Sequence, residues 1–139
     1  LLTGRSPPPL GYERAIAWRP QDPSVGLPAA EKTLAEALRP LGYKSGLVGK
    51  WHLGAHDDFH PNNRGFDEFY GYLGGGHVSF PELQTIRYTH EARNEPESFR
   101  TWMLRGMEPV RAERHLTEDL SIEALDFVRR NSDKPFFLY

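Results

Sequence analysis

The sequence predicts an α/β fold in which helices flank a parallel-type sheet, and two observations carry this prediction. Residues 29–41 have the pattern of a helix and lead into a strand at residues 43–48, and residues 116–131 lead in the same way into a strand at residues 134–139. Repeated helix–turn–strand units of this kind build a sheet that helices cover. The chain has 139 residues, of which 38% are hydrophobic, and this fits a single domain of ordinary size.

The N-terminal part is expected to contain little regular structure. Residues 1–5 read as the last turn of a helix that Gly4 ends, because glycine is the usual residue at a helix C-terminus. Residues 6–28 are expected to form a loop, since prolines recur throughout them and interrupt both helices and strands.

Apolar spacing and end signals predict the first complete helix. Leu34, Leu38 and Leu41 stand at i, i+4 and i+7, which places them on one helix face. Pro40 is expected to end the regular hydrogen bonding there, and Gly42 to close the helix.

The middle of the chain is less regular. Residues 54–63 read as a long loop, residues 74–77 as a glycine-rich turn, and residues 78–112 as short strands and irregular loop. Arg64 and Asp67 are expected to brace a turn. The aromatic residues that follow are expected to pack in the core: Phe66, Phe69, Tyr70 and Tyr72.

The second helix has clear signals at both ends. Thr117 is the expected N-cap, acidic residues follow it, and Arg129 lies near the C-terminus, so the charges complement the helix dipole. Its buried face is expected to comprise Leu120, Ala124, Phe127 and Val128. The apolar residues 134–139 then predict a strand buried in a parallel sheet.

The candidate site lies at the end of the first strand. Successive side chains on a strand alternate between faces, so Lys50 and His52 are expected on one face and Trp51 on the other. A lysine ammonium beside an imidazole suits an anionic oxygen of sulfate or phosphate type. Ligands of α/β folds gather at the carboxyl ends of strands, where this pair falls. The alternative interpretation is a surface lysine and a hydrogen-bonded core histidine.

Composition and motifs exclude several other classes. The 17 basic and 19 acidic residues leave a net charge of −2, which gives no electrostatic case for nucleic acid. Cysteine is absent, so the chain holds no disulfide, thiolate metal site or cysteine nucleophile. No apolar run is long enough to span a membrane. The sequence does not match the motif of a phosphate-binding P-loop, because Lys44 stands where the motif has glycine and Trp51 where it has Ser or Thr.

A group of polar residues after the strand could bind zinc or another divalent cation: His52, His56, Asp57, Asp58 and His60. A helix would be needed to bring the first two histidines together, and Gly54 disfavours a helix there. A solvated polar loop is the preferred interpretation, and no metal ligand is assigned. His77 follows three glycines and could border a substrate site.

Taken together, the motifs resemble those of the sulfatase family, the formylglycine-dependent type with an alkaline phosphatase-like fold. Residues 42–54 match the pattern G-Y-x-S/T-x-x-x-G-K-W-H-L-G, which is specific to the family. Residues 1–5, L-L-T-G-R, match the tail of a motif whose core is C/S-x-P-S-R. Residues 64–71 and 116–139 also resemble family segments in the right order, so the likeness covers most of the chain outside residues 78–112.

The resemblance implies hydrolysis of a sulfate ester of a small molecule or a glycan. It implies that Lys50 contacts the sulfate oxygens and that His52 hydrogen-bonds the hydroxyl of formylglycine, the nucleophile formed from Cys or Ser. His77 is a further candidate for substrate binding. A divalent cation, usually Ca²⁺, accompanies the nucleophile in the family, and family members are periplasmic, secreted or lysosomal.

The sequence lacks parts that the family requires. The nucleophile and the acidic metal ligands have no counterpart in it, so residues 1–139 are expected to be an internal fragment of one catalytic domain and to be inactive alone. Two other functions stay open. One is a phosphodiesterase or phosphonate hydrolase of the same superfamily, and the other is a non-catalytic module that binds sulfated glycans through His77 and the aromatics of residues 66–72.

Overall fold

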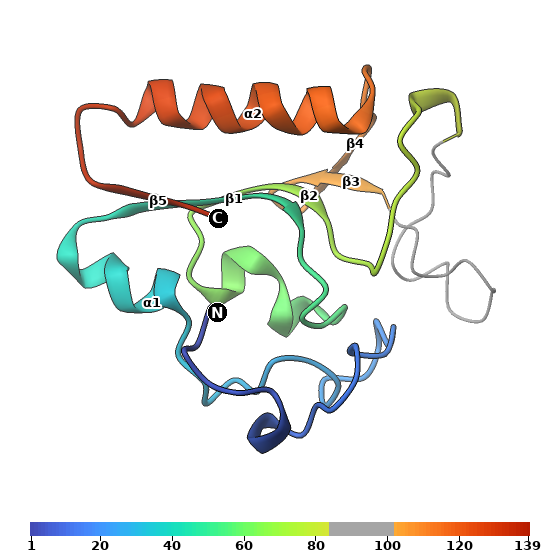
Figure 1. Cartoon of the computed structure of the whole chain (residues 1–139), viewed down its shortest axis with the longest axis vertical. Helices are drawn as coiled ribbons and strands as arrows, with labels where there is room; N and C mark the ends of the chain where they lie inside the picture. Colours follow the sequence, from blue (N-terminus) through green and yellow to red (C-terminus); the bar gives the residue numbers. More distant parts are fainter. Residues whose placement is uncertain (84–101) are drawn as a thin grey trace.

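The computed structural model describes residues 1–83 and 102–139. A sheet of five strands, in the order β4-β3-β2-β1-β5, forms the middle layer. Helix α2 (Leu116–Arg130) lies along one face, while α1 (Leu34–Leu38) and the N-terminal segment lie on the other (Figure 1). The predicted α/β architecture is therefore confirmed.

Four strands run in one direction, and β3 runs against them. The central strand β1 (Lys44–Lys50) pairs in parallel with β2 (Glu68–Tyr72) and with β5 (Phe136–Leu138). The hairpin of β3 (Met103–Arg105) and β4 (Glu108–Val110) extends the sheet antiparallel to β2. The strand predicted at residues 43–48 thus runs two residues further, to Lys50.

The two faces of the sheet bury separate apolar clusters. On the α1 side, Leu47 and Phe69 pack with Ala35, Trp51 and Phe66, and all five are buried. The ring of Trp51 meets that of Phe66 edge-on at 6.0 Å. This packing anchors the residue between Lys50 and His52 in the core.

The opposite face packs against α2. Tyr70 and Met103 from the sheet contact Leu116 at the start of the helix. Further along, Gly46 lets Phe127 lie against the strand, because a Cβ on Gly46 would come within 2.6 Å of the phenyl ring. Burial of such side chains, at about 25 cal/mol per Å², drives the docking of the helix onto the sheet.

The first helix is shorter than residues 29–41. Its N-cap is Thr33, whose side chain accepts a hydrogen bond from the Glu36 N–H while the Glu36 carboxylate accepts from the Thr33 N–H. This capping box fixes the start of the helix. Regular hydrogen bonding ends before Pro40 as predicted, and a 3₁₀ turn (Arg39–Leu41) closes on Gly42 in the left-handed region at φ 81°.

The leucines of that helix do not form a buried stripe. Leu34 and Leu41 are 40% and 68% exposed, and the fully buried residue is Ala35. The helix proper has only five residues. Leu41 therefore lies outside it, in the 3₁₀ turn, and does not share one continuous α-helical face with Leu34.

Helix α2 matches its predicted range within one residue, but His115 is its N-cap rather than Thr117. Phe127 is buried as predicted, while Leu120, Ala124 and Val128 are only partly buried. Asp119 is buried because its carboxylate accepts a hydrogen bond from the Tyr70 hydroxyl. The last strand covers residues 136–138, and it is a half-buried edge strand rather than a buried one.

The remaining segments combine confirmed and corrected predictions. Residues 1–5 form a hydrogen-bonded turn rather than the end of a helix, with Gly4 at φ 68°. The loop after β1 contains two 3₁₀ turns, at Asp57–Phe59 and Pro61–Arg64. Short strands occur within residues 102–112 as predicted, and residues 84–101 of that prediction lie outside the described residues.

Arg64 and Asp67 connect distant segments instead of bracing one turn. The buried Arg64 guanidinium donates to the carbonyl oxygens of Leu27 at 2.6 Å and Glu31 at 2.6 Å. The Asp67 carboxylate accepts from the Ser45 N–H at 2.8 Å. These bonds fix the loops on the α1 side against the start of β1. Phe66, Phe69 and Tyr70 are buried as predicted.

Candidate active site

The carboxyl ends of β1 and β2 carry the candidate site. Lys50 ends β1, is exposed, and lies beside Tyr72 in the parallel register. Just before it, the two strands approach each other closely at Gly49 and Gly71, since a Cβ on Gly71 would lie 1.9 Å from the Gly49 carbonyl oxygen. Glycine at position 71 is therefore required for the strand pair that positions Lys50.

Strand β1 ends at Lys50, and His52 does not have extended backbone. The prediction that strand alternation continues from Lys50 to His52 is therefore wrong. The φ of His52 is 55°, which is the left-handed region, and His52 is the only non-glycine residue with positive φ among those described. Hydrogen bonds hold this conformation: the Trp51 N–H donates to the Tyr72 oxygen at 3.0 Å and the His52 N–H to the Leu73 oxygen at 3.1 Å. The chain after β1 thus stays attached to the chain after β2.

Lys50 and His52 nevertheless interact electrostatically. Burial lowers the pKa of the His52 imidazole below 6.5, the charge of Lys50 lowers it further, and a hydrogen bond with the Ile16 backbone opposes both effects. Burial disfavours the charged imidazolium, and so does a nearby like charge. The imidazole is therefore neutral at pH 7 and can both donate and accept a hydrogen bond.

His52 opens onto a cavity of about 300 Å³ on the α1 side of the molecule. The wall opposite it is built largely by the N-terminal segment, including Leu2, Thr3 and Arg5. The two sequence segments with family-like motifs, residues 1–5 and 42–54, therefore meet at one cavity. Lys50 is exposed and is not among the residues that line this cavity.

His77 lies on the same side of the sheet ends. Its ring is 5.1 Å from that of Tyr72, the register neighbour of Lys50, and its Nδ1 is 3.1 Å from the Val78 oxygen. The half-buried position leaves His77 open to solvent at the edge of the site. The three predicted site residues are thus gathered around the ends of two strands.

The other histidines of the loop have structural roles. His56 and His60 each accept a backbone hydrogen bond through Nδ1, from the N–H groups of Asp58 and Asn62, and so cap the two 3₁₀ turns. Within residues 1–83 and 102–139, no group of three or more His, Asp or Glu side chains is placed to hold a metal ion.

Sequence reasoning missed the contribution of the Tyr72–Gly75 segment. Tyr72 was expected only to pack, and Gly75 only to form a turn. The segment instead accepts the backbone hydrogen bonds of Trp51 and His52, and Gly75 lies against the His52 ring. The run of three glycines before His77 was the available signal, because glycine permits close approach of other groups.

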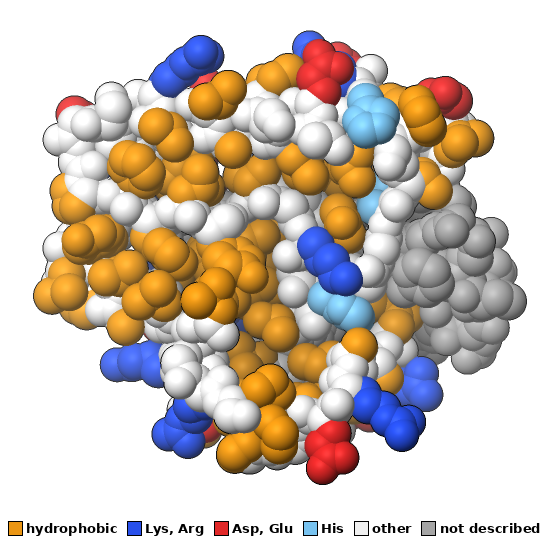
Figure 2. Space-filling model, viewed as in Figure 1, with side chains coloured by type: hydrophobic (Ala, Val, Ile, Leu, Met, Phe, Trp, Pro, Cys, Tyr) orange, Lys and Arg blue, Asp and Glu red, His pale blue; other side chains and the backbone are white. Residues whose placement is uncertain are grey.

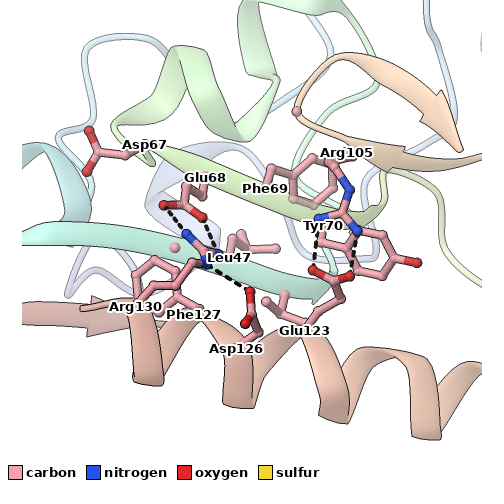
Figure 3. A pocket seen from close by; sticks show the side chains of 13 residues that line it. Leu47, Asp67, Glu68, Phe69, Tyr70, Arg105, Glu123, Asp126, Phe127 and Arg130 are labelled. Carbon is pink, nitrogen blue, oxygen red and sulfur yellow. Dashed lines mark hydrogen bonds and ion pairs between the residues drawn. The ribbon is translucent and has the colours of Figure 1, made fainter. Parts of the chain in front are cut away.

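A second cavity, of about 420 Å³, lies between α2 and the sheet, at the opposite ends of the strands (Figure 3). Its charged groups other than Asp67 are paired with one another. Arg130 binds the carboxylates of Glu68 at 2.9 Å and Asp126 at 2.8 Å, and Arg105 binds Glu123 at 2.8 Å. These pairs join α2 to β2 and β3, so this cavity is interpreted as structural.

Comparison with protein-family models matches the Sulfatase model over residues 1–139. The chain belongs to the sulfatase family. Human N-acetylgalactosamine-6-sulfatase is 37% identical over 152 residues, which cover 100% of this chain and 28% of that protein. Human Arylsulfatase G is 50% identical over 72 residues, which cover 51% of this chain and 13% of that protein. The sulfatase chain therefore spans about 28% of the length of the first of these relatives.

Solved structures agree with this assignment. The structure of Ps i-CgsB in complex with k-i-k-neocarrahexaose superposes with a TM-score of 0.84 at 35% identity, covering 99% of this sulfatase chain and 31% of that one. The PsFucS1 sulfatase from Pseudoalteromonas sp. shares the fold with a TM-score of 0.64 at 24% identity, over 99% and 31% of the two chains. Among the described residues of the sulfatase chain, no helix combines the length and apolar character that crossing a membrane requires.

Proposed function

We propose that the intact protein hydrolyses a sulfate ester, that Lys50 contacts the sulfate oxygens and that His52 hydrogen-bonds the nucleophile. The observation that carries this proposal is the placing of an exposed lysine and a half-buried imidazole at the carboxyl end of β1, inside a segment that belongs to the sulfatase family. The cavity beside His52 supplies space for a substrate group.

Each residue has a distinct role in this proposal. Lys50 places a fixed positive charge where negative charge develops on the sulfate and leaving-group oxygens, which stabilises the transition state. His52, neutral at pH 7, orients a hydroxyl of the nucleophile by hydrogen bonding. His77 contacts the part of the substrate that extends beyond the sulfate.

Sulfatases in general use formylglycine as the nucleophile and a divalent cation, for which we propose Ca²⁺. These groups supply the attacking oxygen and additional positive charge. The chain contains no cysteine, and its described residues include no cluster that could hold a metal ion. The proposal therefore gives residues 1–139 no role in binding the cation, and only the hydrogen bond of His52 as a role toward formylglycine.

We further propose that residues 1–139 are one part of a single catalytic domain. The relatives that match the whole chain are more than three times as long. Apolar surface supports the proposal, since Leu41 and Leu125 are 68% and 55% exposed, and Figure 2 shows broad hydrophobic areas on one face. Apolar patches of this kind are usually covered by further protein.

The proposed substrate is a sulfated glycan. N-acetylgalactosamine-6-sulfatase is named for a sulfated sugar, and Ps i-CgsB was solved with an oligosaccharide. An enzyme with such substrates would work in the periplasm, outside the cell or in the lysosome, and this location stays a prediction of family membership.

Hydrolysis assays on the intact protein test the proposal. Cleavage of an aryl sulfate and of N-acetylgalactosamine 6-sulfate is compared with release of the alcohol from matched phosphate diesters. We expect sulfate esters to be the better substrates. Faster cleavage of the phosphate diesters would instead favour a phosphodiesterase-type enzyme, and glycan binding without hydrolysis would favour a binding module.

A further inference from the structure

The imidazole of His52 is held by a backbone conformation that needs support. A non-glycine residue in the left-handed region costs on the order of 1–3 kcal/mol and persists only where its surroundings enforce it. At His52 the hydrogen bond from its N–H to the Leu73 oxygen, 3.1 Å long, provides one constraint. It fixes the backbone, and a hydrogen bond with the Ile16 backbone holds the ring itself.

Gly75 supplies a second constraint on the ring, by steric contact. A Cβ placed on Gly75 would lie 3.1 Å from both Cε1 and Nε2 of His52, so the backbone of Gly75 lies directly against that edge of the imidazole. The φ of Gly75 is not in the left-handed region, and an alanine could adopt it. Glycine is thus needed there for space and not for backbone conformation.

The contact between Gly75 and His52 also brings the segment that carries His77 against His52. His77 follows Gly75 by two residues, and its ring contacts Tyr72 at the other end of the same short segment. Since Tyr72 and Leu73 bind the backbone of Trp51 and His52, the segment is attached to the site at its N-terminal end, and His77 folds back onto Tyr72.

We propose that Gly75 is a positioning residue that fixes the orientation of the His52 imidazole. The inference rests on the proposed sulfatase function for its effect on turnover, but its effect on the ring can be measured separately. Gly75 touches no reacting atom and acts through His52. A methyl group at position 75 must push the ring edge away by a few tenths of an ångström.

Gly75→Ala in the intact protein tests the proposal, with Gly42→Ala as the control. Gly42 lies at the other end of β1, where a Cβ meets no atom within 4 Å but the φ of 81° strains an alanine. The control therefore introduces backbone strain without contacting His52. We expect Gly75→Ala to lower kcat about 10-fold with KM changed less than about 2-fold, because small misplacements of catalytic groups act on the chemical step. Gly42→Ala should leave both constants within about 2-fold.

Histidine NMR of the same variants, with ¹⁵N-labelled imidazole, provides the second readout. The ring nitrogen shifts and the titration of His52 should change in Gly75→Ala and stay unchanged in Gly42→Ala. Unaltered His52 resonances in Gly75→Ala would overturn the proposal, and so would altered resonances with unchanged kcat. A wild-type protein without sulfatase activity would refute the proposed function, while the NMR comparison would still decide whether Gly75 orients the ring.

Discussion

Lys50 and His52 are two positions apart in the sequence, but different forces place them. Lys50 is placed by strand pairing, because it ends β1 in register with Tyr72. His52 is placed by two contacts with the next loop, at Leu73 and Gly75. Their electrostatic coupling is therefore a product of tertiary structure and not of period-two alternation.

Lys50→Ala in the intact protein should reduce sulfate-ester turnover by about 100-fold or more, because it removes a preorganised charge that stabilises the transition state. The matched control is Lys44→Ala at the other end of the same strand. The Lys44 ammonium lies 4.0 Å from the Asp67 carboxylate and 3.9 Å from the Glu68 carboxylate. Initial rates on an aryl sulfate are the measurement, and equal rates for both variants would contradict the assignment of Lys50.

His60 should make the stability of the protein sensitive to acid. Burial lowers the pKa of its imidazole from 6.5 to about 4, which the charge of Asp57 only partly opposes. The unfolded chain therefore binds this proton more readily than the folded chain. The neutral His60 imidazole therefore adds to the free energy of unfolding. This contribution is fully present above pH 6.5 and is lost as the pH falls toward 4, by up to about 3 kcal/mol.

Urea unfolding of the intact protein at pH 7, 5.5 and 4.5 measures this effect. His60→Gln removes the titrating group and should flatten the pH dependence over this interval, even if its stability at pH 7 is lower. His56→Gln is the control, since His56 caps the preceding turn in the same way. An identical slope for wild type and His60→Gln would refute the prediction.

At the scale of secondary structure, sequence signals located the ends of elements better than their buried faces. Pro40 and Gly42 correctly predicted where the first helix ends. Leu34 and Leu41 were predicted to share one helix face, but the helix has only five residues and both side chains are exposed. Helix length depends here on the capping box at Thr33, which hydrophobic spacing cannot reveal.

The β1–β2 pair should be intolerant of a side chain at its closest point. In Gly71→Ala the methyl group would lie 1.9 Å from the Gly49 carbonyl oxygen, so the two strands must separate. We expect a loss of more than about 2 kcal/mol, in the range of overpacked cores. Thermal or urea unfolding of the intact protein measures it.

Gly106→Ala is the matched control for that substitution. It places a Cβ in ordinary contact, 3.7 Å from Asn62, but at a φ of 57°, so it carries strain without a clash. Gly106→Ala should lower the free energy of unfolding by only about 1 kcal/mol. A smaller loss for Gly71→Ala than for Gly106→Ala would show that the strands can separate at low cost.

For the whole molecule, the fold class could be predicted because both helix–strand units are local in sequence. The candidate site could be predicted only in part. Motif residues Lys50 and His52 were found from the segment at 42–54, but the left-handed backbone of His52 was not, since residues 72–75 impose it from elsewhere in the chain. The antiparallel hairpin of β3 and β4 was similarly indistinct in sequence.

The isolated 139-residue chain should show no sulfate-ester turnover, while the intact protein turns over under the same conditions. The reason is that the chain spans about 28% of a relative such as human N-acetylgalactosamine-6-sulfatase, and its described residues include no metal-binding cluster. A sensitive aryl sulfate assay at matched molar concentration is the measurement. Turnover by the isolated chain above that of its Lys50→Ala variant would contradict this prediction.

The central position of β1 has a consequence for synthesis of the protein. One neighbour, β2, emerges from the ribosome about twenty residues after β1, but the other, β5, is translated only at residues 136–138. Until then one edge of β1 offers unpaired N–H and C=O groups that can join another nascent chain. A chaperone that shields this edge during translation should therefore raise the yield of folded protein more than one added after release.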